Sequence, residues 1–156
     1  MSIITEMVTS PSDDVRELVS ELEETLAAEY PPEQRHGLSL DAIFQPHIRF
    51  FVARVNGFPA GCGGVALFDD FAEVKRMYVR EAVRGQGVAQ AVLGRIEEAT
   101  RAAGLNVLRL ETGDKQFAAL KMYERAGFGP CGVFGVYASK APETIATSIF
   151  LEKRLE

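Results

Sequence analysis

The segment from residue 48 to residue 68 constrains the fold more than any other, because it predicts a β-hairpin. Two apolar, β-rich runs, residues 48–55 and 58–68, are separated by Asn56-Gly57 alone. This dipeptide supplies the positive φ angles that a two-residue type I′ turn requires. Asp69-Asp70 marks the next turn, and residues 72–79 have the pattern of a third strand. The sequence therefore predicts three consecutive antiparallel strands.

Helical patterns lie on both sides of these strands along the chain. Ser10-Pro11-Ser12-Asp13 offers an N-cap serine, Ser10, and a proline at the first helical position, and apolar residues then recur at helical spacing up to Leu26. A second helix is expected over residues 88–103 and a third over residues 116–126. A glycine suited to a helix C-cap follows each of these two helices.

Three more segments, residues 3–7, 107–111 and 147–151, have strand-like patterns, and a short helix is expected around residues 40–44. Helices that lie between strands predict an α/β sandwich built on a mixed sheet. We expect this sheet to be antiparallel at its start and parallel around the second and third helices.

The composition is typical of one globular domain. The chain has 156 residues, of which 47% are hydrophobic and 25% charged. Its net charge of −5 disfavours nucleic-acid binding, because a surface that binds phosphates must be positive. No apolar run reaches membrane-spanning length and no signal-peptide pattern is present, so we expect a soluble, cytoplasmic protein. Cys62 and Cys131 lack zinc or disulfide spacing, which predicts free thiols and no metal site.

The sequence Arg84-Gly85-Gln86-Gly87-Val88-Ala89 lies between a predicted strand and a predicted helix. Its glycines have no Cβ to obstruct a ligand, so consecutive N–H groups can face one anion at the positive end of a helix dipole. A pyrophosphate would fit this loop. Gln90 replaces the third glycine of the dinucleotide fingerprint, and no Gly-Lys-Ser/Thr follows, so the Rossmann and Walker A motifs are both excluded. The alternative is a loop that only turns a strand into a helix.

Four basic residues lie close together around this loop, in a chain that is acidic as a whole. They are Lys75, Arg76, Arg80 and Arg84. Such a basic island is consistent with a phosphate-rich ligand. The alternative for its individual members is the solvated edge of a strand.

The residues on both sides of the loop extend the motif. Lys75-Arg76-Met77-Tyr78-Val79 precedes it, and Tyr123 and Gly127-Phe128 follow it. Together with Arg84-x-x-Gly87-x-Ala89, these residues resemble the GNAT superfamily of N-acetyltransferases. Its small bacterial single-domain members are resembled by residues 73–79, by residues 110–113, and by the tail Phe134-Gly135-x-Tyr137 with Glu152-Lys153. The resemblance implies a GNAT-like mixed sheet with antiparallel N-terminal strands, a parallel pair that splays apart at its centre, and helices on both faces. It also implies a single N-acetyltransferase domain over residues 1–156.

The same resemblance implies acetyl-CoA as the cosubstrate. The loop would bind its pyrophosphate, and the main chain at Met77 and Val79 would bind its pantetheine arm, with an N–H near Met77 for the oxyanion. Gln116 stands where the family usually has an asparagine, and it keeps the amide group. The implied acetyl-CoA contacts are Met77, Tyr78, Val79, Arg84, Gly85, Gln86, Gly87, Val88, Ala89 and Gln116.

Acid and base catalysis need side chains that hold or take a proton. The resemblance implies that Tyr123 is the general acid for the departing thiolate, and the alternative is a core aromatic residue. Glu73 is the first candidate for the general base that takes a proton from the amine, and Glu111 is the second. Both could instead be exposed carboxylates at strand ends. His36 and His47 are further candidates, since imidazole titrates near neutrality.

The expected function is acetyl transfer from acetyl-CoA by direct attack of a primary amine on a small-molecule or amino-acid-like acceptor. Neither a nucleic acid nor a membrane is expected as a partner. The sequence leaves open whether the protein forms a homodimer. One rival hypothesis is a CoA-binding sensor of the same fold without turnover, and another is an interaction domain without a ligand. The sequence identifies neither the acceptor nor the base. Candidates to line the acceptor pocket are Phe44, Phe50, Phe134 and Tyr137.

Overall fold

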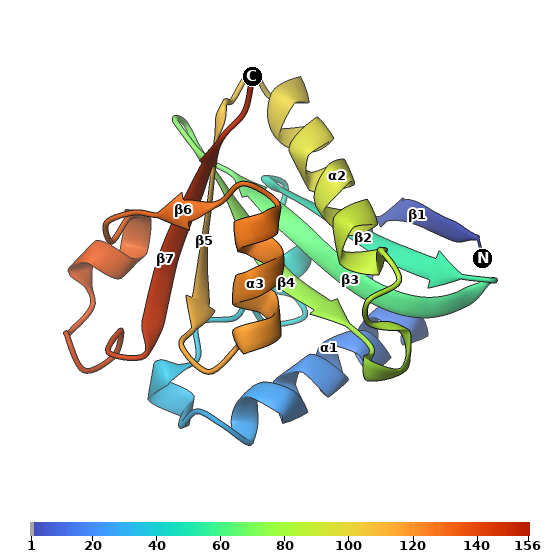
Figure 1. The fold of residues 1–156 in the computed structure, drawn as a ribbon, viewed down its shortest axis with the longest axis horizontal. Coiled ribbons are helices and arrows are strands. Elements are labelled where there is room, and N and C mark those ends of the chain that lie inside the picture. The colour runs from blue at the N-terminus through green and yellow to red at the C-terminus, as the bar shows by residue number, and fades with distance from the viewer. Residues whose placement is uncertain (1) are drawn as a thin grey trace.

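The computed structural model describes residues 2–156, which form a seven-stranded mixed sheet with helices packed on both of its faces (Figure 1). The strand order is β1-β2-β3-β4-β5-β7-β6, and the predicted fold class is confirmed. The strands are β1 (Ile3–Val8), β2 (Ile48–Val55), β3 (Phe58–Leu67), β4 (Ala72–Val79), β5 (Val107–Gly113), β6 (Gly129–Pro130) and β7 (Ser148–Arg154). The helices are α1 (Asp13–Ala27), α2 (Val88–Ala102) and α3 (Phe117–Arg125), with short 3-10 helices at Pro32–Gln34, Ala42–Phe44, Glu81–Val83 and Gly135–Ser139.

The predicted hairpin is confirmed in the first half of the sheet. β2 and β3 pair antiparallel, and the turn residues Asn56 (φ 50°) and Gly57 (φ 86°) both take the left-handed conformation of a type I′ turn. β4 pairs antiparallel with β3, and β1 pairs antiparallel with β2. The first four strands therefore form one continuous antiparallel block.

The alternation of side chains along β2 divides the core between the two faces of the sheet. Phe50 and Val52 pack with the apolar residues of α1, whereas Phe51 and Ala53 pack with those of α2. Tyr123 of α3 belongs to the same apolar cluster as the α2 residues. Accordingly, Figure 1 shows α2 and α3 on one side of the sheet. β2 thus contributes side chains to the apolar clusters on both faces of the sheet.

Helix α1 begins two residues later than predicted. Its N-cap is Ser12, not Ser10: Ser12 has an extended backbone (φ −76°, ψ 169°), and its Oγ accepts a hydrogen bond from the Val15 N–H at 3.3 Å. Pro11 therefore precedes the helix instead of occupying its first position. Both serines suit a cap chemically, and the complete burial of Val15 against the sheet selects where the helix starts.

β4 and β5 are the only parallel neighbours in the described sheet, and they separate after two residue pairs. Residues 72 and 73 of β4 pair with residues 108 and 109 of β5. Beyond this point the register of β4 against β3 also shifts, and Arg76 takes a positive φ of 54°. Residues 74–79 of β4 consequently have no strand partner on the β5 side. The predicted splayed pair is confirmed, and its opening forms the candidate site.

The C-terminal part of the sheet differs from the prediction. The sheet was expected to be parallel around α3, but β7 lies between β5 and β6 and is antiparallel to both. α3 therefore connects two strands that are not neighbours. β5 and β7 also extend beyond their predicted ranges, because their pairing continues from Val107 with Arg154 to Gly113 with Ser148. The place of β7 depends on how the chain returns to the sheet, which no local pattern encodes.

Three further findings concern the described residues as a whole. Within residues 2–156, no helix is both long enough and apolar enough to cross a membrane. No group of three or more His, Cys, Asp or Glu side chains in this range is placed to hold a metal ion. Cys62 and Cys131 are free, and burial in the core beneath α1 raises the pKa of the Cys62 thiol to about 12. Cys62 is therefore an unreactive core residue.

Candidate active site

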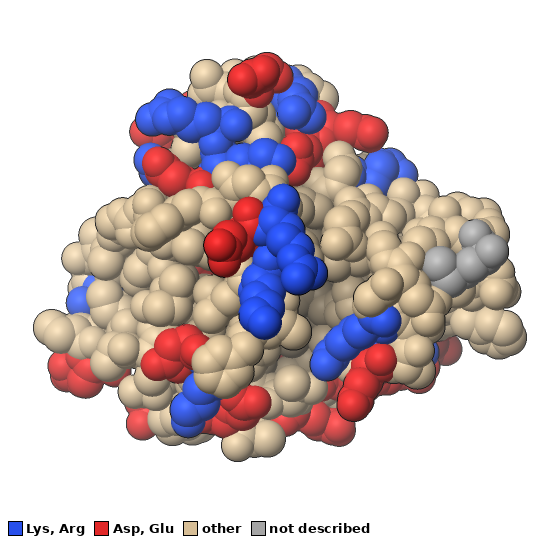
Figure 2. All heavy atoms as spheres, viewed as in Figure 1, with Lys and Arg blue, Asp and Glu red and all other residues tan. Residues whose placement is uncertain are grey.

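A cavity of about 580 Å³ opens where β4 and β5 separate. It is lined by these strands, by the loop before α2, by α3, and by the end of α1 with residues 34–37. Figure 2 shows a recess between Lys and Arg side chains that lie over α3 and over the loop before α2. The lining holds six Lys or Arg residues and three Glu, although the chain as a whole is acidic. The cavity therefore favours anionic ligands.

The loop between β4 and α2 forms the end of the cavity that we expect to hold a pyrophosphate. Gly85 and Gly87 have φ angles of 79° and 91°, which other residues adopt only with strain. Because Gly87 is the N-cap of α2, no cap side chain competes for the N–H groups of the first turn. A Cβ at Gly85 would meet no atom within 4 Å, so the space at the loop is open. These features fit a phosphate-binding role.

Nine of the ten predicted acetyl-CoA contacts line the cavity. The exception is Gln86, which is exposed and lies outside the lining. Gln116 is the N-cap residue of α3, where its side chain makes no capping hydrogen bond. Residues 77–79 line the cavity along the edge of β4 that β5 leaves unpaired. An extended ligand such as a pantetheine arm can hydrogen-bond to this edge as an added strand does.

The predicted basic island is largely neutralised inside the protein. Lys75 pairs with Glu73 at 2.8 Å, and Arg76 pairs with Glu23 of α1. Arg84 is exposed, and it has no ion pair within residues 2–156. Its Nε donates a hydrogen bond to the last carbonyl oxygen of β4 at 3.0 Å. Within residues 2–156, Arg84 is thus the member of the island that has no carboxylate partner, which leaves its charge available for a phosphate.

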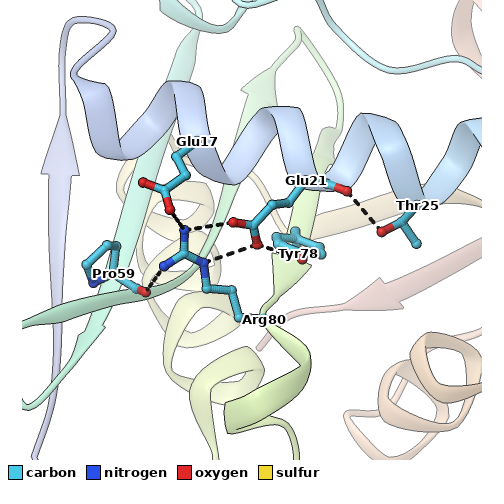
Figure 3. Close-up of polar contacts among 6 residues, drawn as sticks. All are labelled: Glu17, Glu21, Thr25, Pro59, Tyr78 and Arg80. Atoms are coloured by element: carbon cyan, nitrogen blue, oxygen red, sulfur yellow. Dashed lines mark hydrogen bonds and ion pairs between the residues drawn. The ribbon is translucent and has the colours of Figure 1, made fainter.

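Arg80 has a structural role, since it joins β4 to α1 (Figure 3). Its Nε and Nη2 donate to the two carboxylate oxygens of Glu21 at 3.1 and 2.8 Å, and Nη2 also reaches Glu17 at 2.5 Å. Its Nη1 donates to the main-chain oxygen of Pro59 at 3.0 Å. The Tyr78 hydroxyl donates to the same Glu21 carboxylate at 3.0 Å. This clamp, defined as Glu17, Glu21, Tyr78 and Arg80, holds α1 against the strand that bounds the cavity.

Tyr123 lies in the wall of the cavity with its ring against Phe128, and only 4% of the residue is exposed. Burial raises the pKa of Tyr123, and the negative charge of Glu111 raises it further. The phenol therefore keeps its proton throughout the physiological pH range. A buried, protonated hydroxyl at the open side of β4 is suited to donate a proton to a leaving group.

Glu73, the first candidate base, is buried and already engaged. Its carboxylate pairs with Lys75 and accepts a hydrogen bond from the Tyr137 hydroxyl at 2.7 Å. Lys75 Nζ in turn lies 3.2 Å from the Tyr137 hydroxyl oxygen. The carboxylate of Glu73 is thus engaged by an ion pair and a hydrogen bond within the protein, which fits a structural role.

Glu111, the second candidate, lies in the same cavity with fewer partners. The Ser148 hydroxyl of β7 donates to its Oε2 at 2.7 Å. Burial raises the pKa of Glu111, while this hydrogen bond and the charges of His36 and Lys75 oppose the rise. The net upward direction brings the pKa of Glu111 closer to neutral pH, which suits a general base.

The two histidines are separated by the fold. His36 lines the cavity, with its Nε2 at 3.0 Å from the main-chain oxygen of Thr144 and its ring edge-on to Tyr137. His47 is not part of the lining, and its ring packs against Phe68. Of the two histidines, only His36 therefore lines the cavity.

Three of the four aromatic residues predicted to line the acceptor pocket do not line the cavity. Phe44 and Phe50 contact each other in the core beneath α1, because the alternation of β2 turns Phe50 to that face. Phe134 packs among Tyr137 and Phe150 in a separate apolar cluster. Tyr137 is the one that lines the cavity.

The connection between α1 and β2 contributes residues to the cavity that no sequence pattern predicted. The Tyr30 hydroxyl accepts a hydrogen bond from the Lys115 N–H at 2.8 Å and donates to Asp114 at 3.4 Å. Its ring occupies the space that a side chain at Gly113 would need. Arg35 lines the cavity from the same connection. The local pattern gives no signal for these residues, because their partners lie elsewhere in the chain.

Comparisons with known proteins agree with this geometry. Residues 13–128 match the model of the acetyltransferase (GNAT) family. An IAA acetyltransferase of Azospirillum brasilense is 41% identical over 145 residues, which cover 92% of each chain. The chain belongs to the GNAT family, and it is an N-acetyltransferase with an acyl-CoA-binding fold.

Two solved structures share the fold at lower identity. The PaiA N-acetyltransferase of Thermoplasma acidophilum, in complex with coenzyme A, has a TM-score of 0.76 at 19% identity, with 99% of each chain covered. A GNAT family acetyltransferase of Elizabethkingia anophelis, with acetyl-CoA bound, has a TM-score of 0.66 at 17% identity, with 98% of each covered. In both comparisons the shared fold covers nearly the whole chain.

Proposed function

We propose that the protein acetylates a primary amine of a small molecule by direct attack on acetyl-CoA, with Glu111 as the general base and Tyr123 as the general acid. The observation that carries the proposal is the placement of these two side chains in one cavity at the splay of β4 and β5. A carboxylate beside a protonated phenol provides a proton acceptor and a proton donor for one reaction.

Glu111 is preferred to Glu73 as the base because of their partners. Glu73 is bound by Lys75 and by Tyr137, so protonation would break an ion pair. Glu111 has one hydroxyl partner, Ser148, and its pKa is raised by burial. The charge of Glu111 also raises the pKa of Tyr123, which supports a short distance between the proposed base and the proposed acid.

In the proposed reaction, Glu111 takes one proton from the acceptor ammonium and passes it to solvent. The free amine then attacks the acetyl carbon, so that a C–N bond forms and the C–S bond breaks. Tyr123 donates its proton to the departing sulfur, and the second proton of the nitrogen restores Tyr123 through water. The unpaired main chain of β4 near Met77 supplies the N–H donor for the negative oxygen.

The acceptor is tested by thiol release from acetyl-CoA with a panel of primary amines, measured together with the mass of the acetylated product. Because the 41% identical relative is named an IAA acetyltransferase, IAA is assayed as a separate candidate acceptor beside the amines. Thiol release that depends on an amine and yields its acetyl derivative supports the proposal. Stabilisation by acetyl-CoA with no release for any amine would favour the rival sensor without turnover.

A further inference from the structure

Two arginines in the cavity wall share a single carboxylate. Arg76 of β4 and Arg35 of the connection after α1 both pair with Glu23 of α1, Arg35 at 3.8 Å. The side chain of Arg76 is only 3% exposed and that of Arg35 is 23% exposed. Two guanidinium groups against one carboxylate leave an unbalanced positive charge at the wall of the cavity.

Both arginines also hold an unused hydrogen-bond donor. Within residues 2–156, the Nε atoms of Arg35 and Arg76 are the buried side-chain atoms that find no hydrogen-bond partner. A buried donor without an acceptor is unfavourable, so such atoms in a native fold call for an explanation. Burial lowers the pKa of Arg76, which shows that its charge is held against a desolvation cost. A bound anion would remove both deficits.

The neighbouring carboxylates do not supply that anion. Glu73 is occupied by Lys75 and Tyr137, and Glu111 is bound to Ser148. Glu29, the remaining carboxylate of the lining, is exposed and forms no ion pair within the described chain. An anionic ligand in the cavity could therefore supply the partner that these carboxylates do not.

We propose that Arg35 and Arg76 bind the carboxylate of the acceptor, so that the substrate class is an amino acid or another amine that carries a carboxylate. This inference rests on the proposed function, in which the amine of the same acceptor is acetylated. A guanidinium group matches a carboxylate because its planar N–H donors can contact both oxygens.

The position of the arginines relative to Glu111 favours a substrate with both charges. Arg35 and Arg76 line the same cavity as Glu111, and so do His36 and Lys75, whose charges act on Glu111. The proposed carboxylate site and the proposed base therefore share one cavity. An amino acid can place its ammonium group near Glu111 while its carboxylate contacts the arginines.

Matched pairs of acceptors test this inference directly. Phenylalanine is compared with phenethylamine, and methionine with 3-(methylthio)propylamine, so that the members of each pair differ only in the carboxylate. Thiol release is measured for the wild type and for the Arg35→Gln and Arg76→Lys variants. Arg76→Lys keeps the charge but loses the Nε donor. Arg16→Gln is the control, because Arg16 is exposed on α1 and lies outside the cavity.

We expect kcat/KM to be about tenfold or more higher for the amino acid than for its amine in at least one pair. Arg35→Gln should reduce this preference toward one by raising KM for the amino acid, with the amine little changed, and Arg76→Lys should reduce it as well. Arg16→Gln should leave the preference intact. The increase in Tm with acetyl-CoA verifies that each variant is folded.

Other outcomes separate this inference from the proposed function. Equal rates within every pair, or a preference that survives in both variants, would overturn the carboxylate site while leaving the transferase proposal in place. If no acceptor releases thiol, the same pairs are compared by the increase in Tm in the presence of CoA. Stabilisation by an amino acid that is lost in Arg35→Gln would support the site without turnover, and no stabilisation by any amino acid would overturn it.

Discussion

Tyr123 occupies a buried position that keeps its phenol protonated, and the choice of general acid is tested there. Tyr123→Phe keeps the ring and its contact with Phe128. We expect kcat to fall by about 10²–10⁴-fold, the value of general acid catalysis, with acetyl-CoA affinity near that of the wild type. Stability should change by no more than about 1 kcal/mol. An unchanged kcat under conditions where chemistry limits turnover would rule out this role.

Glu111 couples activity to stability through one raised pKa. The folded protein holds the proton of Glu111 more tightly than the unfolded chain does. Stability from this group is therefore greatest below its ordinary pKa and falls as the pH rises through the raised value. Activity has the opposite dependence, because the base must be ionised. We expect wild-type kcat/KM to fall as the pH drops through the raised pKa of Glu111.

The variant Glu111→Gln should separate these two effects. It keeps an oxygen for the Ser148 hydroxyl but cannot ionise. We expect kcat/KM to fall by about 10²–10⁴-fold and its acidic limb to disappear. At pH 8 the Tm of the variant should equal or exceed that of the wild type, and this difference should shrink toward pH 4. A lower Tm at pH 8 would show that the carboxylate stabilises the fold instead.

At the scale of elements, the clamp between α1 and β4 sets one wall of the cavity. Glu21→Ala removes the acceptor of three hydrogen bonds, two from Arg80 and one from Tyr78. We expect the free energy of unfolding in urea to fall by about 1–3 kcal/mol, because charge-assisted bonds are lost. Glu24→Ala is the matched control, since Glu24 is exposed on the same helix. Equal losses in the two variants would contradict the clamp.

The loop before α2 is tested by a change that its backbone cannot accept. Gly87 has a φ of 91°, so Gly87→Val forces a branched side chain into a left-handed conformation at a cost of about 1–2 kcal/mol. We expect acetyl-CoA to no longer raise the Tm of this variant. Gly94→Ala, within α2 and with open space for a Cβ, should retain the increase. Normal acetyl-CoA affinity in a folded Gly87→Val variant would place the pyrophosphate elsewhere.

At the scale of the whole molecule, the two halves of the fold meet at the cavity, so a ligand there should stabilise both. A hundredfold excess of acetyl-CoA over its Kd adds about 2.7 kcal/mol to the free energy of unfolding. For a chain of this size we expect Tm to rise by about 5–10 °C. NAD and ATP at equal concentration should have smaller effects. No change at millimolar acetyl-CoA would contradict the cofactor site.

The sequence by itself determined the features that depend on local chemistry. Asn56-Gly57 specifies the hairpin because positive φ angles at two consecutive residues suit few other pairs. The glycines between β4 and α2 mark the loop for the same reason, and they belong to the motif that resembles the GNAT family. Helical spacing of apolar residues located the three α-helices, although the packing of Val15 selected the first residue of α1.

Only the tertiary structure decided which distant side chains meet. It placed Ser148 on Glu111, and it joined Arg35 and Arg76 through Glu23. It also inserted β7 beside β5 and turned three of the predicted pocket aromatics away from the cavity. The physical reason is that a turn or a helix depends on neighbours in sequence, whereas burial, ion pairing and pKa depend on segments that approach only when the sheet forms.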